Sequence, residues 1–162
     1  MIVRTASAAE TRAVGAAIAG CLAVGDIVVL AGDLGSGKTT LAQGIAAALG
    51  VTEPVVSPTF AIVREYDGEV PIAHVDVYRL DHVQELHDLG FEEIVDGSRV
   101  VLVEWGELIA PILPVDRVVV RLHLADDDDD ARVIDVSAEG SERSPALRER
   151  LSSALQSFSG VR

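Results

Sequence analysis

Two continuous apolar runs alternate along this chain with stretches in which apolar residues recur at helical spacing. Residues 27–31 and 100–103 are apolar throughout, which predicts short strands buried on both faces. A capping box at 7–10 begins an Ala-rich stretch, so we expect a helix through Leu22 that ends before Gly25. Residues 39–49 predict a second helix, stopped by Gly50. The pattern therefore predicts helix, strand, glycine-rich loop and helix in that order.

The middle of the chain is predicted to form a hairpin and a broken helix. Residues 60–66 and 70–77 flank Asp67-Gly68, a pair typical of tight primed turns, which predicts an antiparallel β-hairpin. Pro71 indicates that the second strand lies near a sheet edge or that its nitrogen is free there. Residues 80–95 carry apolar side chains at loosely helical spacing, and Gly90 interrupts that segment.

The C-terminal part is predicted to contain a strand pair and a last helix. Residues 118–124 and 132–136 have strand character, and five aspartates at 126–130 lie between them. Because like charges repel, we expect a solvated acidic loop at 126–130; a calcium site there would lack ligand spacing with a turn glycine. Residues 144–158 predict a helix whose apolar face packs on the sheet.

Composition and charge narrow the class of protein. The 162 residues are 49% hydrophobic and 24% charged, as in a globular chain, and we expect one domain over 1–162. The charge-free stretch at 13–25 is too short to span a bilayer, so we expect no membrane anchor. Cys21 is the only cysteine, so no internal disulfide can form, and we expect a location in the reducing cytoplasm. A net charge of −13 disfavours direct binding to DNA or RNA.

Candidate chemistry centres on Lys38, the single lysine beside twelve arginines among the thirteen basic residues. The sequence from Gly32 to Thr39 matches G-x-x-x-x-G-K-[ST] and lies between a predicted strand and a predicted helix, where a phosphate-binding loop belongs. Glycines let the backbone N–H groups point at phosphates, and the start of the helix adds its positive end. The residues expected to bind the nucleotide here are Asp33, Leu34, Gly35, Ser36, Gly37, Lys38, Thr39 and Thr40.

A P-loop also needs an acid near Mg²⁺, and two candidates end apolar runs. Asp76 follows residues 72–75 and Glu104 follows residues 100–103, and the spacing alone does not choose between them. The chain contains no asparagine, so it lacks the N-K-x-D motif that reads guanine, and adenine is the expected base. The resulting fold class is α/β: a single P-loop NTPase-like domain with a mixed β-sheet, an antiparallel hairpin and flanking helices.

Three further segments occur in order with the P-loop: Ser57-Pro58-Thr59-Phe60, His74-Val75-Asp76-Val77-Tyr78-Arg79-Leu80 and Glu104-Trp105. Together, over about residues 26–124, they resemble the TsaE (YjeE) family. Its members are bacterial P-loop ATPases needed for threonylcarbamoyl modification of the tRNA adenosine beside the anticodon, and they act with the partner proteins TsaB and TsaD.

The resemblance implies roles for several residues. Thr39 and Glu104 would bind Mg²⁺, Lys38 the phosphates, and Asp76 would support hydrolysis, so the expected catalytic residues are Lys38, Asp76 and Glu104. Thr59 would lie in a switch-like loop within reach of the γ-phosphate or the metal, and His74 would orient a loop. Trp105 would report the nucleotide state, contact a partner or pack in the core. A transition-state arginine would be Arg79 or would come from a partner.

The expected function is therefore an ATPase with ATP or ADP and Mg²⁺ as ligands, weak or inactive without TsaB and TsaD. Because the chain is so acidic, tRNA is expected to be reached only through these partners. Two other interpretations of the same motif stay open. One is a small-molecule P-loop kinase, which needs an acceptor site, and the other is a nucleotide-sensing module that binds without hydrolysis.

Overall fold

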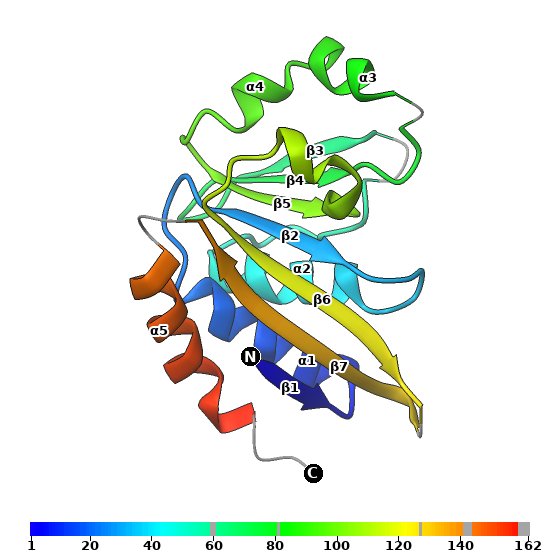
Figure 1. The fold of residues 1–162 in the computed structure, drawn as a ribbon, viewed down its shortest axis with the longest axis vertical. Coiled ribbons are helices and arrows are strands. Elements are labelled where there is room, and N and C mark those ends of the chain that lie inside the picture. Colours follow the sequence, from blue (N-terminus) through cyan, green and yellow to red (C-terminus); the bar gives the residue numbers. More distant parts are fainter. Residues whose placement is uncertain (59–60, 81, 127, 141–143, 159–162) are drawn as a thin grey trace.

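A mixed β-sheet forms the centre of the computed structural model (Figure 1). The model describes residues 1–162 apart from 59–60, 81, 127, 141–143 and 159–162. Within these described residues, seven strands are arranged in the order β1-β7-β6-β2-β5-β4-β3. β6, β2, β5 and β4 run parallel to one another, and β7, β1 and β3 pair antiparallel. The strand bounds are β1 (Ile2–Thr5), β2 (Ile27–Ala31), β3 (Val63–Tyr66), β4 (Ile72–Asp76), β5 (Val100–Glu104), β6 (Arg117–Ala125) and β7 (Asp128–Glu139).

Helices cover both faces of this sheet, which confirms the α/β class. Side chains of α1, α2 and α5 share one core cluster with Val28 and Leu30 of β2. Side chains of α3, α4 and the 3₁₀ helix η1 share a second cluster with Ile27 and Val29. β2 is thus buried on both faces, as its apolar run predicts. The helical bounds are α1 (Ala8–Ala19), α2 (Lys38–Ala48), α3 (Val83–Asp88), α4 (Phe91–Ile94), α5 (Ser144–Leu155), η1 (Gly106–Ile112) and η2 (Gln156–Phe158).

Most helix predictions are confirmed by the local chemistry that motivated them. Ser7 caps α1 by accepting a hydrogen bond from the Glu10 amide at 3.2 Å. Gly90 separates α3 from α4 and has a φ of 72°, a left-handed conformation that glycine adopts easily. The apolar face of α5 is buried against β7 and α1, as predicted. No helix in the described part of the chain has the length and apolarity needed to cross a membrane.

The acidic run is not the solvated loop that was predicted. Asp128, Asp129 and Asp130 belong to β7, Asp126 lies in the turn, and residue 127 is outside the described part. Repulsion between the carboxylates does not prevent pairing here because all three strand side chains are exposed and solvated. The backbone of this run is free to continue the β6–β7 ladder, in which Ala125 pairs with Asp128.

Two further features differ from the prediction. β1 was not expected, because so short a strand carries little pattern of its own and forms through pairing with β7, where Ile2 faces Asp135. β3 and β4 do pair antiparallel, with Tyr66 opposite Ile72, but the predicted tight turn at Asp67-Gly68 is wrong.

Residues 67–71 connect β3 to β4 over the C-terminal end of α2. The amide of Val70 donates to the carbonyl of Leu49 at 3.2 Å, so tertiary contact with the helix replaces a tight turn. Pro71 immediately precedes β4, which is an interior strand between β5 and β3. β4 is next to the edge strand β3, so it lies near a sheet edge, as one of the two alternatives for Pro71 has it. Pro71 also precedes Ile72, the first paired residue of β4, so the ladder requires no N–H at this position.

Candidate nucleotide site

The glycine-rich loop joins β2 to α2 at the carboxyl edge of the parallel strands. β2 lies between β5 and β6, so the loop has one neighbour on each side. Gly32 has a φ of 134°, and a Cβ there would lie 2.2 Å from the carbonyl oxygen of Leu122 in β6. Only glycine fits this close approach. The Ser36 amide donates to the Asp33 carbonyl at 3.1 Å, which closes the turn before α2 begins.

Lys38 is 5% exposed and folds back over this loop. Its Nζ donates to the carbonyls of Gly32 at 2.7 Å and Asp33 at 2.8 Å. The same Nζ lies 3.9 Å from the centroid of the Trp105 ring, a cation–π contact. Burial lowers the pKa of Lys38, and the nearby carboxylate of Glu104 partly opposes that shift. The ammonium is thus held in place by weak neutral acceptors that a phosphate can outcompete.

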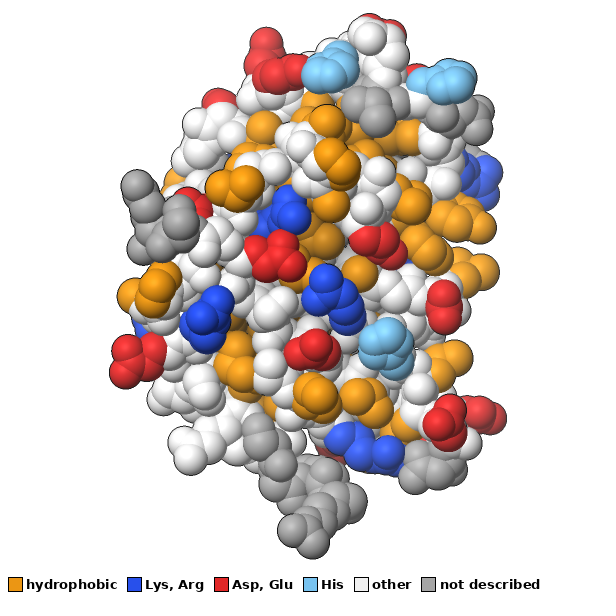
Figure 2. All heavy atoms as spheres, in the orientation of Figure 1, with side chains coloured by type: hydrophobic (Ala, Val, Ile, Leu, Met, Phe, Trp, Pro, Cys, Tyr) orange, Lys and Arg blue, Asp and Glu red, His pale blue; other side chains and the backbone are white. Residues whose placement is uncertain are grey.

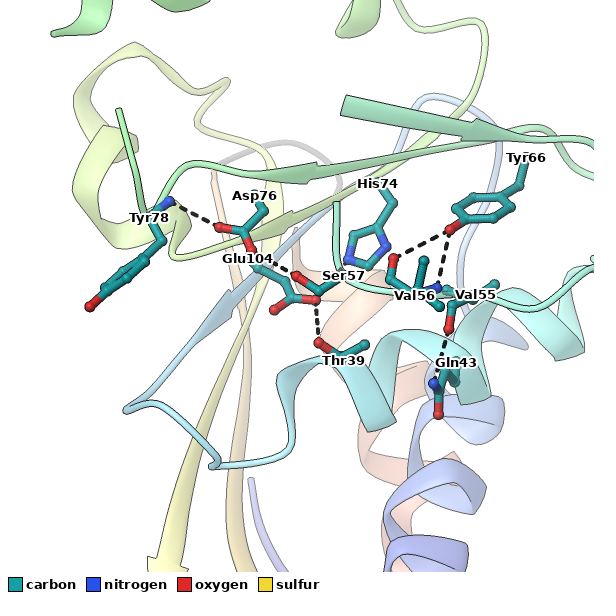
Figure 3. Close-up of polar contacts among 10 residues, drawn as sticks. All are labelled: Thr39, Gln43, Val55, Val56, Ser57, Tyr66, His74, Asp76, Tyr78 and Glu104. Atoms are coloured by element: carbon teal, nitrogen blue, oxygen red, sulfur yellow. Dashed lines mark hydrogen bonds and ion pairs between the residues drawn. The ribbon is translucent and has the colours of Figure 1, made fainter. Parts of the chain in front are cut away.

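The two candidate acids meet side by side at the end of neighbouring strands. Asp76 of β4 is directly opposite Glu104 of β5, and the two residues are 4% and 3% exposed. Glu104 Oε1 accepts from the hydroxyl of Thr39 at 2.8 Å and lies 2.8 Å from His74 Nε2. Asp76 Oδ2 accepts from the hydroxyl of Ser57 at 2.8 Å, and Oδ1 accepts from the Tyr78 amide at 3.0 Å (Figure 3). One acid therefore faces the P-loop helix and the other faces the loop that contains Ser57.

These groups surround a cavity of about 440 Å³. It is lined by most of the predicted site residues, together with Ser57, Tyr78, Arg79 and Trp105. Asp33 and Ser36 do not line it: Asp33 acts through its carbonyl on Lys38, and Ser36 is 1% exposed. Thr59 lies outside the described residues. The predicted residues on the cavity wall are Leu34, Gly35, Gly37, Lys38, Thr39, Thr40, Asp76 and Glu104.

The donor set at Thr39 and Glu104 suits a nucleotide-bound magnesium ion. A hydroxyl and a carboxylate oxygen are both hard ligands, and here they are 2.8 Å apart. Among the described residues, no group of three or more His, Cys, Asp and Glu side chains forms a metal cluster. Mg²⁺ usually takes one or two protein carboxylates and completes its shell with phosphates and water. The pair therefore fits an ion that arrives with a nucleotide.

Several contacts in the site were not predicted from the sequence. His74 is fully buried and contacts Glu104 itself, whereas the resemblance only implied that it orients a loop. Trp105 adopts a left-handed φ of 61° and stacks on Tyr78 with a centroid distance of 4.7 Å. It is partly buried in the second core cluster and also reaches Lys38, so it both packs and lines the cavity.

Arg132 of β7 contacts the P-loop although it lies far from it in the sequence. Its Nη2 donates to the Gly35 carbonyl at 3.3 Å, although the two residues are 97 positions apart. Its Nη1 donates to the carbonyls of Asp129 at 2.7 Å and Ala131 at 2.8 Å. A smaller cavity of about 60 Å³ lies here and shares Thr40 with the main cavity. No local motif marks Arg132, because only the pairing of β7 with β6 brings it to the loop.

Comparison with known proteins adds evidence that is independent of this geometry. A family model described as "Threonylcarbamoyl adenosine biosynthesis protein TsaE" matches residues 5–134, beyond the motif-bearing segments at both ends. The chain is 44% identical over 150 residues to the tRNA threonylcarbamoyladenosine biosynthesis protein TsaE of Bacillus subtilis, covering 92% of each chain. A protein of the same name from Streptomyces coelicolor is 41% identical over 136 residues, covering 80% of this chain and 90% of that one.

A solved structure agrees with the sequence comparisons. The crystal structure of Bacillus subtilis YdiB matches the fold with a TM-score of 0.79 and 38% sequence identity, covering 94% of both chains. The family model spans most of the 162 residues, and the similarity continues through the sheet that forms the site. The chain therefore belongs to the TsaE family of threonylcarbamoyl adenosine biosynthesis proteins.

Proposed function

We propose that this chain binds ATP with Mg²⁺ at the P-loop and hydrolyses it to switch its contact with the proteins TsaB and TsaD. Family membership supports the wider role in tRNA threonylcarbamoyladenosine biosynthesis. The observation that carries the proposal is the 2.8 Å contact between Thr39 and Glu104 beside the buried Lys38. These are the hydroxyl, carboxylate and ammonium that a P-loop hydrolase needs in one place.

Binding follows from the groups around the loop. The β- and γ-phosphates would replace the Gly32 and Asp33 carbonyls as partners of Lys38, and the N-terminus of α2, which begins at Lys38, would add backbone N–H groups to the anion site. Thr39 and Glu104 would hold Mg²⁺, which when bound neutralises charge on the phosphates. The ribose and base would extend past Thr40 towards Arg132, because Thr40 lines both the main cavity and the smaller one.

Hydrolysis requires a positioned water. Asp76 lies beside Glu104 on the cavity wall and is held by Ser57 and the Tyr78 amide, so its carboxylate has a fixed position from which it would orient water towards the γ-phosphorus. The water oxygen forms the new bond to phosphorus as the bond to the β–γ bridging oxygen breaks. ADP leaves with that oxygen, and the proton of the water ends on inorganic phosphate or solvent. Arg79 lines the cavity, and the developing charge would be stabilised by Arg79 or by an arginine of a partner.

Surface charge supports indirect handling of tRNA. The net charge is −13, and on the face shown in Figure 2 the described basic side chains are interspersed with acidic ones instead of forming a basic patch. A polyanion gains little from such a surface. We therefore propose that TsaB and TsaD contact tRNA and that this chain acts on them in the cytoplasm.

Phosphate release with and without TsaB and TsaD tests the proposal. We expect slow release by the chain alone, faster release with both partners, and losses of at least about 100-fold in Lys38→Ala and Glu104→Ala. Undiminished release by both variants would refute the assignment. ADP formation that depends on an added metabolite would indicate a kinase, and tight binding without hydrolysis would indicate a sensing module.

Nucleotide preference can be measured separately by thermal shift. A ligand at one hundred times its Kd stabilises the folded state by about 2.7 kcal/mol. We expect ATP and ADP with Mg²⁺ to raise the Tm, and GTP to raise it less, because the chain has no asparagine for a guanine-reading motif. A larger shift with GTP would contradict the adenine assignment.

A further inference from the structure

The segment that leads into Ser57 is held by side chains. Residues 54–58, between α2 and β3, form no helix or strand, so secondary structure supplies no ladder of backbone hydrogen bonds. Instead, Gln43 Nε2 donates to the Val55 carbonyl at 2.9 Å. The hydroxyl of Tyr66 accepts from the Val56 amide at 3.2 Å and donates to the Val56 carbonyl at 3.3 Å (Figure 3).

These two anchors come from opposite sides of the segment. Gln43 lies on α2, about one turn beyond Thr39, so it moves with the helix that begins in the P-loop. Tyr66 is 2% exposed and lies on β3, where it pairs with Ile72 of β4, the strand that ends at Asp76. Val55 and Val56 are therefore clamped between the P-loop helix and the strand pair that contains Asp76.

The next residue along the chain carries the consequence. Ser57 lines the main cavity and donates its hydroxyl to Asp76 Oδ2 at 2.8 Å. We infer that Gln43 and Tyr66 are positioning residues that fix the backbone of Val55 and Val56, so that Ser57 holds Asp76 in its hydrolytic orientation. This inference rests on the proposed ATP hydrolysis. Neither Gln43 nor Tyr66 lines the cavity, so both act through Ser57 and not on the nucleotide.

Solvent exposure predicts how loss of an anchor appears in experiments. Val56 is 45% exposed, so water can replace the Tyr66 hydroxyl as a partner of its backbone groups. The fold then survives Tyr66→Phe, but the segment is no longer fixed in one place. We expect kcat to fall about tenfold while the Kd for ATP stays within about twofold. Gln43→Met, which keeps the length of the side chain, is expected to act in the same direction.

A double-mutant cycle tests whether Tyr66 acts through Ser57. If it does, Ser57→Ala already removes the contribution of the Tyr66 contact to kcat, and adding Tyr66→Phe to Ser57→Ala changes kcat by less than about twofold. Multiplied losses in the double variant would overturn the inference. Ser144→Ala is the matched control, because it removes a buried hydroxyl-to-carbonyl bond of 3.0 Å, to Ala138, far from the cavity. Its kcat should equal that of the wild type.

Residue-resolved amide hydrogen exchange gives a readout that needs no hydrolysis. Tyr66→Phe should speed exchange of the Val56 amide about tenfold, because that amide loses its acceptor, and Ser144→Ala should leave it unchanged. Unchanged exchange in Tyr66→Phe overturns the inference. If the wild-type chain releases no phosphate even with TsaB and TsaD, the proposed hydrolysis fails. Hydrogen exchange at Val56 then still tests whether Tyr66 fixes the backbone of this segment. Wild-type kcat in Tyr66→Phe together with faster exchange also overturns the positioning role.

Discussion

The two sides of the P-loop are built from different chemistry. On the β5 side, Glu104 and Asp76 are almost fully buried beside a cavity of about 440 Å³. On the β6–β7 side, half-buried Arg132 contacts the loop at Gly35, next to a cavity of only about 60 Å³. Thr40 lines both cavities and lies between the two sides.

This difference suggests a division of labour within one site. Buried carboxylates are costly to keep charged, and the contacts with Thr39, His74 and Ser57 show that both acids are held in fixed positions. A partly exposed arginine beside a small cavity suits recognition of a ligand more than bond breaking. We therefore expect substitutions on the β5 side to lower kcat and substitutions on the β6–β7 side to alter the affinity for ATP.

Glu104→Gln should have the largest effect. The amide keeps the shape of the side chain but removes the charge that would hold Mg²⁺ with Thr39. We therefore expect kcat to fall by about 100-fold or more, and the Mg²⁺ concentration needed for half-maximal phosphate release to rise. Steady-state phosphate release at several Mg²⁺ concentrations measures both. Glu149→Gln is the control, since it removes the same charge from an exposed residue of α5. Equal losses in the two variants would point to overall charge as the cause.

Asp76→Asn should have the next largest effect. We expect kcat to fall about 30-fold, because the amide accepts protons and orients water less well, while the Kd for ATP changes by less than about twofold. Phosphate release and ATP binding, measured on the same preparation, separate the two quantities. Exposed Asp67→Asn should match the wild type. An equally large loss of affinity in Asp76→Asn would break the proposed distinction between the two acids.

Arg132→Ala tests the other side of the loop. Removing the guanidinium should weaken ATP binding about tenfold, equivalent to about 1.4 kcal/mol, and leave kcat at saturating ATP within about twofold. Isothermal calorimetry and saturation kinetics provide the two values. Arg121→Ala, an exposed arginine on β6, is the control. If kcat falls while affinity is retained, Arg132 takes part in the chemical step and the comparison fails.

Asp129→Ser should give the smallest effect. Asp129 is exposed, and its backbone carbonyl accepts a hydrogen bond from Arg132. The carboxylate of Asp129 therefore mainly adds negative potential on the β6–β7 side. We expect ATP affinity to increase about twofold at low ionic strength and this gain to disappear near 0.5 M salt. Titrations at the two salt concentrations measure it. A decrease in affinity would mean that this carboxylate supports the site directly.

Local sequence predicted much of the fold because local chemistry decides much of it. The N-cap at Ser7, the apolar run of β2 and the break at Gly90 each appear as expected. The predicted capping box is only half formed, because the Glu10 carboxylate accepts from the Ala6 amide and not from that of Ser7. β1 and the strand character of Asp128–Asp130 were missed, since both depend on pairing with a strand elsewhere in the chain. The connection after Asp67 was also missed, because contact with the end of α2 decides its shape.

In the site too, local sequence identified the candidate residues but not the contacts between them. The P-loop could be found from its motif, and Asp76 and Glu104 were candidates because each ends an apolar run. Their direct opposition depends on the register between β4 and β5, which spacing along the chain does not specify. The contact of Trp105 with Lys38 depends likewise on a left-handed turn at the end of β5.

By itself, the sequence determined a glycine-rich loop that carries a phosphate-binding motif with one lysine, in which backbone conformation and helix start are encoded within a few residues. The tertiary structure alone decided that Arg132 reaches this loop from β7 and that Tyr66 and Gln43 clamp the approach to Ser57. The physical reason is the range of the interactions involved. Hydrogen bonds and packing within a turn depend on neighbouring residues, whereas contacts between strands and helices depend on the register and order of the whole sheet.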